Sequence, residues 1–452
     1  MRPTLTLAAF TLLAGVAAAQ DTPLIERGSY IATAGDCRGC HGEDLSGGAP
    51  IGSPLGTIYA SNITPDATGI AGWTEADLRD ALRKGRSPDK GWLFPAMPYT
   101  SYTGMTDGDI AALHAYLQSL PAVSHQVPET ELPFPFIRPA MIAWNLLNLT
   151  VGEPVGAQPA TGDAAERGRY LVETLGHCTA CHSPRNALMG EASGQHLSGA
   201  FIGGWYAPNI TPDATGIGGW SDAQLTSLLQ NGHNDQAAVG GDMAVAVSLS
   251  LSRLPDGDIA DMVAYLRQIP AITTQAPAPV PATPAIVDPD TVEGPITGWE
   301  SLAATDTTDG AVLYQSACAS CHGQSGGGAA GPDLAMLRDL RMVPANNLVQ
   351  VIANGIDRQT PNGHALMPGF RDQLNDAQIA AIADYTRKTF AGNPALAVDQ
   401  AQVASILSGE MQVGWLLRNA PVLARVGIAL ALLLAAGLAM RLIDQGKRRR
   451  AA

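Results

Sequence analysis

The stretch CRGCH at residues 37–41 recurs in modified form as CTACH at 178–182 and as CASCH at 318–322. The pattern C-x-x-C-H is the attachment signature of c-type haem, in which two thiols bond the haem and the histidine becomes an axial ligand of the iron. All six cysteines of the chain belong to these stretches. The sequence therefore predicts three covalently attached haem c groups. The thiols are those of Cys37, Cys40, Cys178, Cys181, Cys318 and Cys321, and the histidines on iron are His41, His182 and His322.

Cysteines at this spacing have other interpretations, namely disulfides, zinc sites or a thioredoxin-type motif. An exported chain with six cysteines can be disulfide-bonded. Disulfides, however, give no reason for a histidine directly after every second cysteine. A zinc site would need paired C-x-x-C units or two distant histidines. The haem assignment is the one that uses every cysteine and the histidine beside it.

Each haem needs a second axial ligand, which we expect before the last helix of each domain. Met97 and Met367 are each followed by proline, which holds the backbone extended and leaves the methionine free to face the iron. Met243 lacks this proline but is the only methionine in the corresponding part of the second domain. A methionine sulfur raises the haem potential relative to a second histidine. The competing ligands are His114, His233 and His364.

The chain also repeats itself outside the haem stretches. NITPDATGI at 62–70 recurs unchanged at 209–217, and a Gly-Trp pair follows each copy. We expect a loop over the haem edge here, where Trp73 and Trp220 either donate to a haem propionate or only seal the pocket. DGDI at 107–110 recurs at 256–259 and opens a segment with apolar residues at helical spacing.

These repeats predict a mainly α fold of three tandem small cytochrome c domains. Proline-rich stretches between them favour extended spacers. The expected divisions are a signal peptide 1–19, domain 1 at 20–125, a linker 126–160, domain 2 at 161–272, a Pro-rich linker 273–296, domain 3 at 297–392 and a transmembrane helix at 420–441.

The two ends of the chain predict its location. A short apolar run ending in an A-x-A site is typical of a cleaved export signal, with an uncleaved anchor as the alternative. The run at 420–440, apolar except for Arg425, is followed by Arg441 and a basic cluster at 447–450, which favours a spanning helix at 420–441 with its charges inside. The alternative is a helix lying on the membrane surface. We therefore expect periplasmic haem domains on the inner membrane, held by a single C-terminal anchor.

The overall charge restricts the partners. The formal net charge is −14 and the isoelectric point is about 5.0, whereas a surface that binds nucleic acid needs clustered lysines and arginines. We expect no nucleic-acid partner.

Taken with its repeats, the sequence resembles the three-haem cytochrome c subunit of membrane-bound periplasmic dehydrogenases, such as those that oxidise alcohol, gluconate, sorbitol or fructose. The resemblance rests on the three C-x-x-C-H stretches, the two NITPD loops, FPAMPY at 94–99, AWN at 143–145 and the C-terminal apolar run. It covers nearly the whole mature chain. It implies His/Met ligation, with the pairs His41/Met97, His182/Met243 and His322/Met367.

The resemblance implies an electron relay. Electrons would come from a separate catalytic subunit of the flavin, pyrroloquinoline quinone or molybdenum type and pass through the haems to ubiquinone. The chain holds no dinucleotide fingerprint and no recognisable catalytic triad, so we expect no catalytic residue and no catalysis by the chain alone. The alternatives are a periplasmic haem enzyme of the peroxidase kind, which needs an open iron, and a haem subunit of a terminal oxidase.

Overall fold

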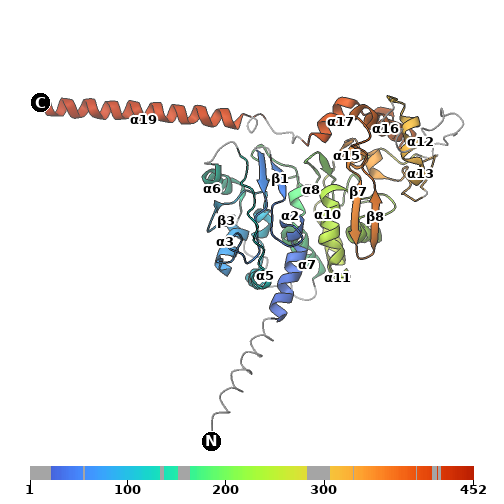
Figure 1. Ribbon diagram of the computed structural model, residues 1–452, viewed down its shortest axis with the longest axis horizontal. Helices are drawn as coiled ribbons and strands as arrows, with labels where there is room; N and C mark the ends of the chain where they lie inside the picture. The colour runs from blue at the N-terminus through green and yellow to red at the C-terminus, as the bar shows by residue number, and fades with distance from the viewer. Residues whose placement is uncertain are drawn as a thin grey trace, which may run out of the picture.

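Helices dominate this protein, as the sequence predicts. The computed structural model describes residues 22–53, 56–132, 137–150, 163–281, 306–328, 330–392, 394–409, 415 and 419–451. The expected signal peptide lies outside the described residues, as does most of the linker expected at 273–296. The described helices form three units, and the strands make only two-stranded antiparallel hairpins (Figure 1).

The first unit begins with a helix over residues 22–34 and ends with α5. The repeated NITPD loop lies between its second hairpin strand and α3. Its elements are α2 (Cys37–His41), β1 (Pro50–Ser53), β2 (Gly56–Tyr59), α3 (Glu75–Lys84), β3 (Arg86–Ser87), β4 (Gly91–Trp92), α4 (Tyr99–Tyr102) and α5 (Asp107–Ser119), and α6 (Ile137–Asn148) follows in the connection.

The second unit repeats the order of first helix, haem turn, hairpin and two further helices. Its elements are α7 (Ala164–Arg169), η1 (Tyr170–Leu175), α8 (Thr179–His182), β5 (Ala200–Ile202), β6 (Trp205–Ala207), α9 (Asp222–Asn231), α10 (Gly241–Leu249), η2 (Leu251–Arg253) and α11 (Asp256–Leu266). Here α10 and η2 stand where the first unit has β3, β4 and α4.

The third unit keeps the outer helices and is followed by a short tail. Its elements are α12 (Gly310–Ala317), α13 (Ala319–His322), α14 (Arg338–Arg341), α15 (Asn346–Asn354), β7 (Ile356–Thr360), β8 (Gly363–Met367) and α16 (Asp376–Thr389), and η5 (Pro394–Leu396) and α17 (Gln400–Leu407) follow.

In every unit the first helix crosses the last helix at a glycine. A Cβ atom at Gly28 would lie 2.0 Å from the carbonyl oxygen of Ala112, and one at Gly168 would lie 1.9 Å from that of Asp261. At Gly310 the corresponding distance is 2.3 Å. Any side chain at these positions would push the two helices apart. The haem stretch follows the first helix, so this crossing sets the position at which the stretch begins.

The second unit carries one more residue than the first between this glycine and the first cysteine of its haem stretch. The structure takes up the extra residue by forming η1, a turn of π-helix. A π-helix bonds each N–H to the carbonyl five residues back, so it accommodates one residue without breaking the helix.

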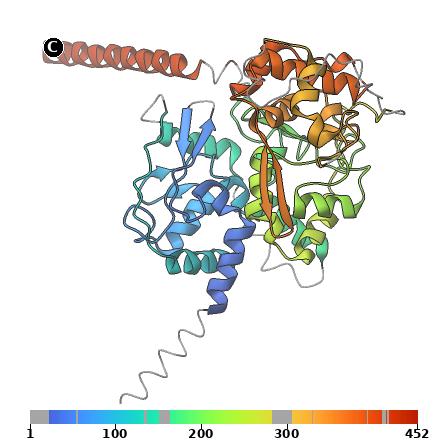
Figure 2. The same cartoon turned by 45° about the vertical axis from the view of Figure 1, so that its right-hand side comes forward.

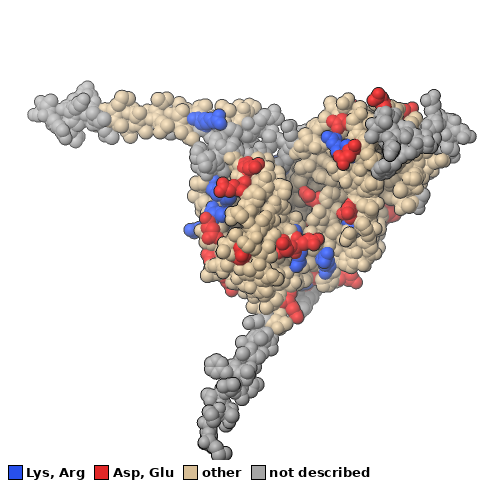
Figure 3. Space-filling model, in the orientation of Figure 1, with Lys and Arg blue, Asp and Glu red and all other residues tan. Residues whose placement is uncertain are grey.

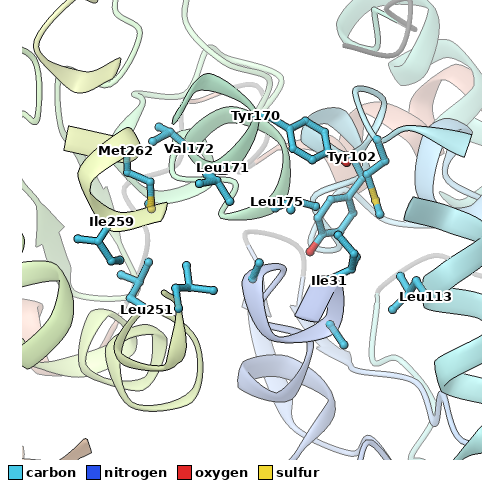
Figure 4. Close-up of a cluster of buried hydrophobic side chains, with 14 of the residues drawn as sticks. Ile31, Tyr102, Leu113, Tyr170, Leu171, Val172, Leu175, Leu251, Ile259 and Met262 are labelled. Atoms are coloured by element: carbon cyan, nitrogen blue, oxygen red, sulfur yellow. The ribbon is translucent and has the colours of Figure 1, made fainter. Parts of the chain in front are cut away.

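The first two units share one hydrophobic core. Figure 4 shows buried side chains from both, with Tyr102 of the first unit beside Tyr170 and Leu175 of the second. The third unit has a core of its own, built around α12, α15 and α16. Figure 2 shows its β7–β8 hairpin running alongside α10, which contacts β7.

The prediction of a transmembrane helix at 420–441 is wrong. Helix α19 (Ala420–Ala451) forms there, but no helix among the described residues is long and apolar enough to cross a membrane. Fifteen uncharged residues separate Arg425 from Arg441, and at about 1.5 Å per residue they cover about 22 Å, less than a hydrocarbon core of about 30 Å. On the face that Figure 3 shows, the described part of α19 carries one basic patch and is otherwise uncharged, yet the single C-terminal anchor is not supported.

Candidate haem sites

Each haem stretch folds as a short helical turn at the end of the first helix of its unit. In the first two stretches the residue before the first cysteine is left-handed, with φ 47° at Asp36 and 38° at His177. This reverses the chain sharply and separates the haem turn from the helix before it. The turns themselves are α2, α8 and α13, and the second cysteine and the histidine of each stretch lie within one turn of each other.

The imidazole of each of these histidines is oriented by a backbone carbonyl. His41 Nδ1 lies 2.6 Å from the carbonyl oxygen of Ser61. His182 Nδ1 lies 2.7 Å from the carbonyl oxygen of Pro208, and His322 Nδ1 lies 3.4 Å from that of Pro332. Donation from Nδ1–H selects the tautomer whose Nε2 keeps a lone pair, which is the form that binds a metal. Burial lowers the pKa of all three histidines, which favours the neutral ring.

The cysteines of the haem stretches are not cross-linked to one another. All six are described, and none forms a disulfide. Burial raises the pKa of Cys37 to about 12 and that of Cys40 to about 11, so the thiols are held in the neutral form. Among the described residues, no three His, Cys, Asp or Glu side chains are grouped as a metal ion would require, in contrast to the zinc interpretation.

The three methionines predicted as second ligands lie at the edges of the same cores as the cysteines. Met97 and Cys37 pack against the shared core of the first two units, as do Met243 and Cys178. Met367 packs against the core of the third unit together with Cys318. Met97 lies in a turn before α4 and Met367 at the end of β8, whereas Met243 lies in the first turn of α10.

These residues fit a covalently bound haem. In each unit the first cysteine of the haem stretch and the methionine pack at the edge of an apolar core. The histidine of the same stretch has its Nδ1 beside a backbone carbonyl. The histidines that compete as ligands have other partners: His114 Nε2 lies 2.9 Å from the Trp73 oxygen, His233 Nδ1 3.1 Å from the Asn231 oxygen and His364 Nε2 2.7 Å from the Asp357 carboxylate. The pairing of each methionine with an iron stays a prediction.

The first and second haem stretches lie close together. The Tyr102 hydroxyl donates to the carbonyl of Gly35 at 3.0 Å, and its ring meets the His177 ring edge-on with centroids 5.7 Å apart. Helix α10 contacts α2 as well, and Asp242 at its start is near enough to raise the pKa of both Cys40 and Cys181, after the larger effect of burial.

Sequence reasoning missed a reciprocal pair of hydrogen bonds between the first two units. The Tyr30 hydroxyl donates to Asp258 at 2.7 Å, and the Tyr170 hydroxyl donates to Asp109 at 2.6 Å. An arginine of the same unit as each aspartate, Arg27 or Arg167, also binds it. The repeats ERGxY and DGDI contain all these residues. The DGDI repeat predicts only the opening of a helical segment, and neither repeat predicts which residue of the other unit it contacts. We refer to these contacts as the Tyr–Asp pair.

The arginines that join the third unit to the second were also missed. Arg358 is 2% exposed and donates to the carbonyl oxygens of Asn231 at 2.9 Å and Val239 at 2.8 Å. Arg338 is 8% exposed and donates to backbone carbonyls of the second NITPD loop. Because the acceptors are backbone atoms, no sequence pattern marks them.

The Gly-Trp tryptophans have partners within the protein. The Trp73 indole N–H donates to Asp89 at 2.7 Å, and the Trp220 ring lies 5.9 Å from the Arg338 guanidinium.

The chain is similar to proteins of known class over most of its length. A family model described as cytochrome c matches residues 25–121 and 165–270, and one described as cytochrome C oxidase, cbb3-type, subunit III matches residues 305–385. The fructose dehydrogenase cytochrome subunit of Gluconobacter japonicus is 38% identical over 95% of this chain and 92% of its own. The cytochrome c subunit of the quinone alcohol dehydrogenase of Gluconacetobacter polyoxogenes is 34% identical over 90% of each chain. The gluconate 2-dehydrogenase cytochrome c subunit of Pantoea cypripedii is 33% identical over 86% of this chain and 90% of its own. The cytochrome c match means that the attached group is covalent haem c.

Proposed function

Because this chain belongs to the family of cytochrome c subunits of dehydrogenases, we propose that it is the electron-transfer subunit of a periplasmic dehydrogenase. It takes electrons from a separate catalytic subunit and passes them through three haem c groups to ubiquinone. The observation that carries this proposal is the near full-length similarity to such subunits. The recurrence of one set of side chains in all three units supports it, because a relay needs several equivalent centres.

The proposed axial pairs are His41/Met97, His182/Met243 and His322/Met367. Haem iron, when bound, supplies a centre that gains and loses one electron. The chain contributes the rest: carbonyls that hold each imidazole, apolar cores that exclude water, and thioethers that favour a high potential. With both axial positions filled by side chains, no iron binds substrate, so oxidation of the substrate belongs to the partner.

The domain limits 20–125, 161–272 and 297–392 stay a prediction, as does the partner cofactor of flavin, pyrroloquinoline quinone or molybdenum type. Location in the periplasm is supported by the apolar N-terminal run with its A-x-A site.

A second candidate function is a haem subunit of a terminal oxidase. The match of residues 305–385 to the cbb3-type subunit III model favours it. That match covers the third unit alone, whereas the dehydrogenase subunits align with almost the entire chain.

The proposal is tested by purifying the native complex and adding fructose, ethanol, acetaldehyde, gluconate or sorbitol while haem reduction is followed by absorbance. We expect one substrate to reduce the haems quickly, and added ubiquinone to reoxidise them. Mass analysis of the chain should show three attached haems, and one fewer after Cys318→Ala with Cys321→Ala. A haem that binds carbon monoxide, with no reduction by any of these substrates, would favour the haem-enzyme alternative.

A further inference from the structure

Two copies of one loop fold identically in the first and second units. In the first copy, Asn62 Oδ1 accepts from Thr64 N at 2.9 Å, and its Nδ2 donates to the Val123 oxygen at 2.8 Å. In the second copy, Asn209 makes the same bonds to Thr211 and Ile272, both at 2.8 Å. An aspartate carboxylate then closes the turn: Asp66 accepts from Thr68 N in the first copy, and Asp213 accepts from Thr215 N in the second, both at 2.8 Å. The backbone carbonyls of the two loops are therefore presented in the same way.

The second copy holds an arginine of the third unit. Arg338 Nη1 donates to the Gly216 oxygen at 2.6 Å, and its Nη2 donates to the Thr215 oxygen. The same guanidinium lies 5.9 Å from the centre of the Trp220 ring. Two consecutive carbonyls beside an aromatic face suit the planar fork of arginine better than the point charge of lysine.

The first copy presents the same acceptors to solvent. Thr68 and Ala67 are exposed, whereas Thr215 is buried. Within the described part of the chain, no hydrogen-bond donor reaches the carbonyl oxygen of Thr68 or Gly69. Trp73 packs against the shared core as Trp220 does. The first copy adds the Asp89 carboxylate, which accepts from the Trp73 indole.

We propose that the first NITPD loop is a docking site for an arginine side chain of the catalytic subunit. This inference rests on the proposed function, which requires such a partner. The bound Arg338 in the second copy shows which side chain the loop accepts. Asp89 strengthens the attraction, and the net charge of −14 favours a partner with a cationic contact surface.

The test places a charge beside the carbonyls and compares the two copies. Ala67 and Ala214 are equivalent, and both are exposed. The variants are Ala67→Arg, Ala67→Glu and, as matched control, Ala214→Arg. The dissociation constant between haem-loaded cytochrome subunit and purified catalytic subunit is measured at low and high salt, with haem spectra as the control for folding.

We expect Ala67→Arg to weaken binding at least about tenfold, because a like charge is placed beside the incoming cation. Ala67→Glu should bind as tightly as the wild type or more tightly, and the difference between the two should shrink at high salt. Ala214→Arg should leave the dissociation constant unchanged, since Arg338 already fills that loop.

Equal binding by wild type and Ala67→Arg would overturn the inference while leaving the proposed function intact. A fall of the same size in Ala214→Arg would also overturn it, because the effect would not belong to the first loop. Self-association that depends on Ala67 would point to a second copy of the chain instead and overturn the choice of partner. Absence of any binding by the wild type would count against the proposed function itself.

Discussion

The joint between the first and second units differs in kind from the joint between the second and third. The first joint is a continuous apolar core with hydroxyl groups crossing it to aspartates. The second leaves two separate cores and is bridged by buried guanidinium groups on backbone carbonyls. Burial of apolar surface is non-directional and grows with area, whereas hydrogen bonds depend on alignment. The first joint therefore makes one folding unit of two haem sites, and the second docks a unit that has its own core.

The largest effect is expected from a cavity in the shared core. Leu175 is 1% exposed, and Leu175→Ala should lower the free energy of unfolding of the first two units together by about 2–5 kcal/mol. Hydrogen exchange with mass spectrometry during urea unfolding resolves the units. Leu340→Ala in the third unit, where Leu340 is 3% exposed, is the control and should destabilise that unit alone. If Leu175→Ala speeds hydrogen exchange in the second unit but not in the first, the two units do not unfold as one, and the contrast between the two joints fails.

Removal of the buried guanidinium should release the third unit. Arg358→Ala leaves two backbone carbonyls without their charged donor, which costs about 3 kcal/mol. We expect faster exchange of β7 and of the loop at 231–239, with the first joint unaffected. That loop leads into α10, which carries Met243. The sulfur-to-iron absorption band of the haem for which Met243 is the predicted ligand should therefore weaken too. Arg371→Ala, which removes an exposed ion pair with Asp376, should change neither. Unchanged exchange in Arg358→Ala would show that apolar contacts hold the joint.

A smaller effect is expected from the Tyr–Asp pair. Tyr170→Phe and Tyr30→Phe each remove one hydroxyl from a buried carboxylate that keeps its arginine. Each should lower the free energy of unfolding of the first two units by about 1 kcal/mol. Chemical denaturation measures this change. If only one of the two substitutions lowered the free energy of unfolding, the two hydrogen bonds would not contribute equally to stability, although their geometry is equivalent.

The smallest effect is a pH dependence confined to the second unit. Hydrogen bonds to Glu173 and Glu191 raise the pKa of His196 to about 10. A histidine whose folded pKa is raised stabilises the fold fully below its unfolded pKa of about 6.5, and this contribution is lost as pH rises through 10. The difference in unfolding free energy between wild type and His196→Gln should therefore decrease from pH 6.5 to pH 10. A difference that is constant over this range contradicts the assignment.

Much of the architecture was predictable because local rules decide it. The stretches at 37–41, 178–182 and 318–322 each follow a helix, and the segments opened by DGDI become α5 and α11. Thr106 caps α5 by accepting from Asp109 N, as the cap preference predicts. The cofactor class followed from the C-x-x-C-H pattern, which has few competing explanations.

The joints could not be predicted, because their acceptors are backbone atoms or residues distant in sequence. Tyr30 and Asp258 are 228 positions apart, and nothing local links them. The π-helix η1 follows from a single extra residue that is visible only when the first two units are compared. The error at 420–441 came from counting across Arg425, since the uncharged run that follows this arginine has only fifteen residues.

The bonds of Arg338 and Arg358 to main-chain oxygens have an evolutionary consequence. A substitution in the second unit changes a side chain but leaves its carbonyl in place as long as the loop keeps its path. The contacts of these two arginines with the second unit can thus survive while the loop sequences drift, as can those of Asn347, which donates to the Tyr206 carbonyl. The first two units, whose side chains interlock in one core, would have to be inherited together.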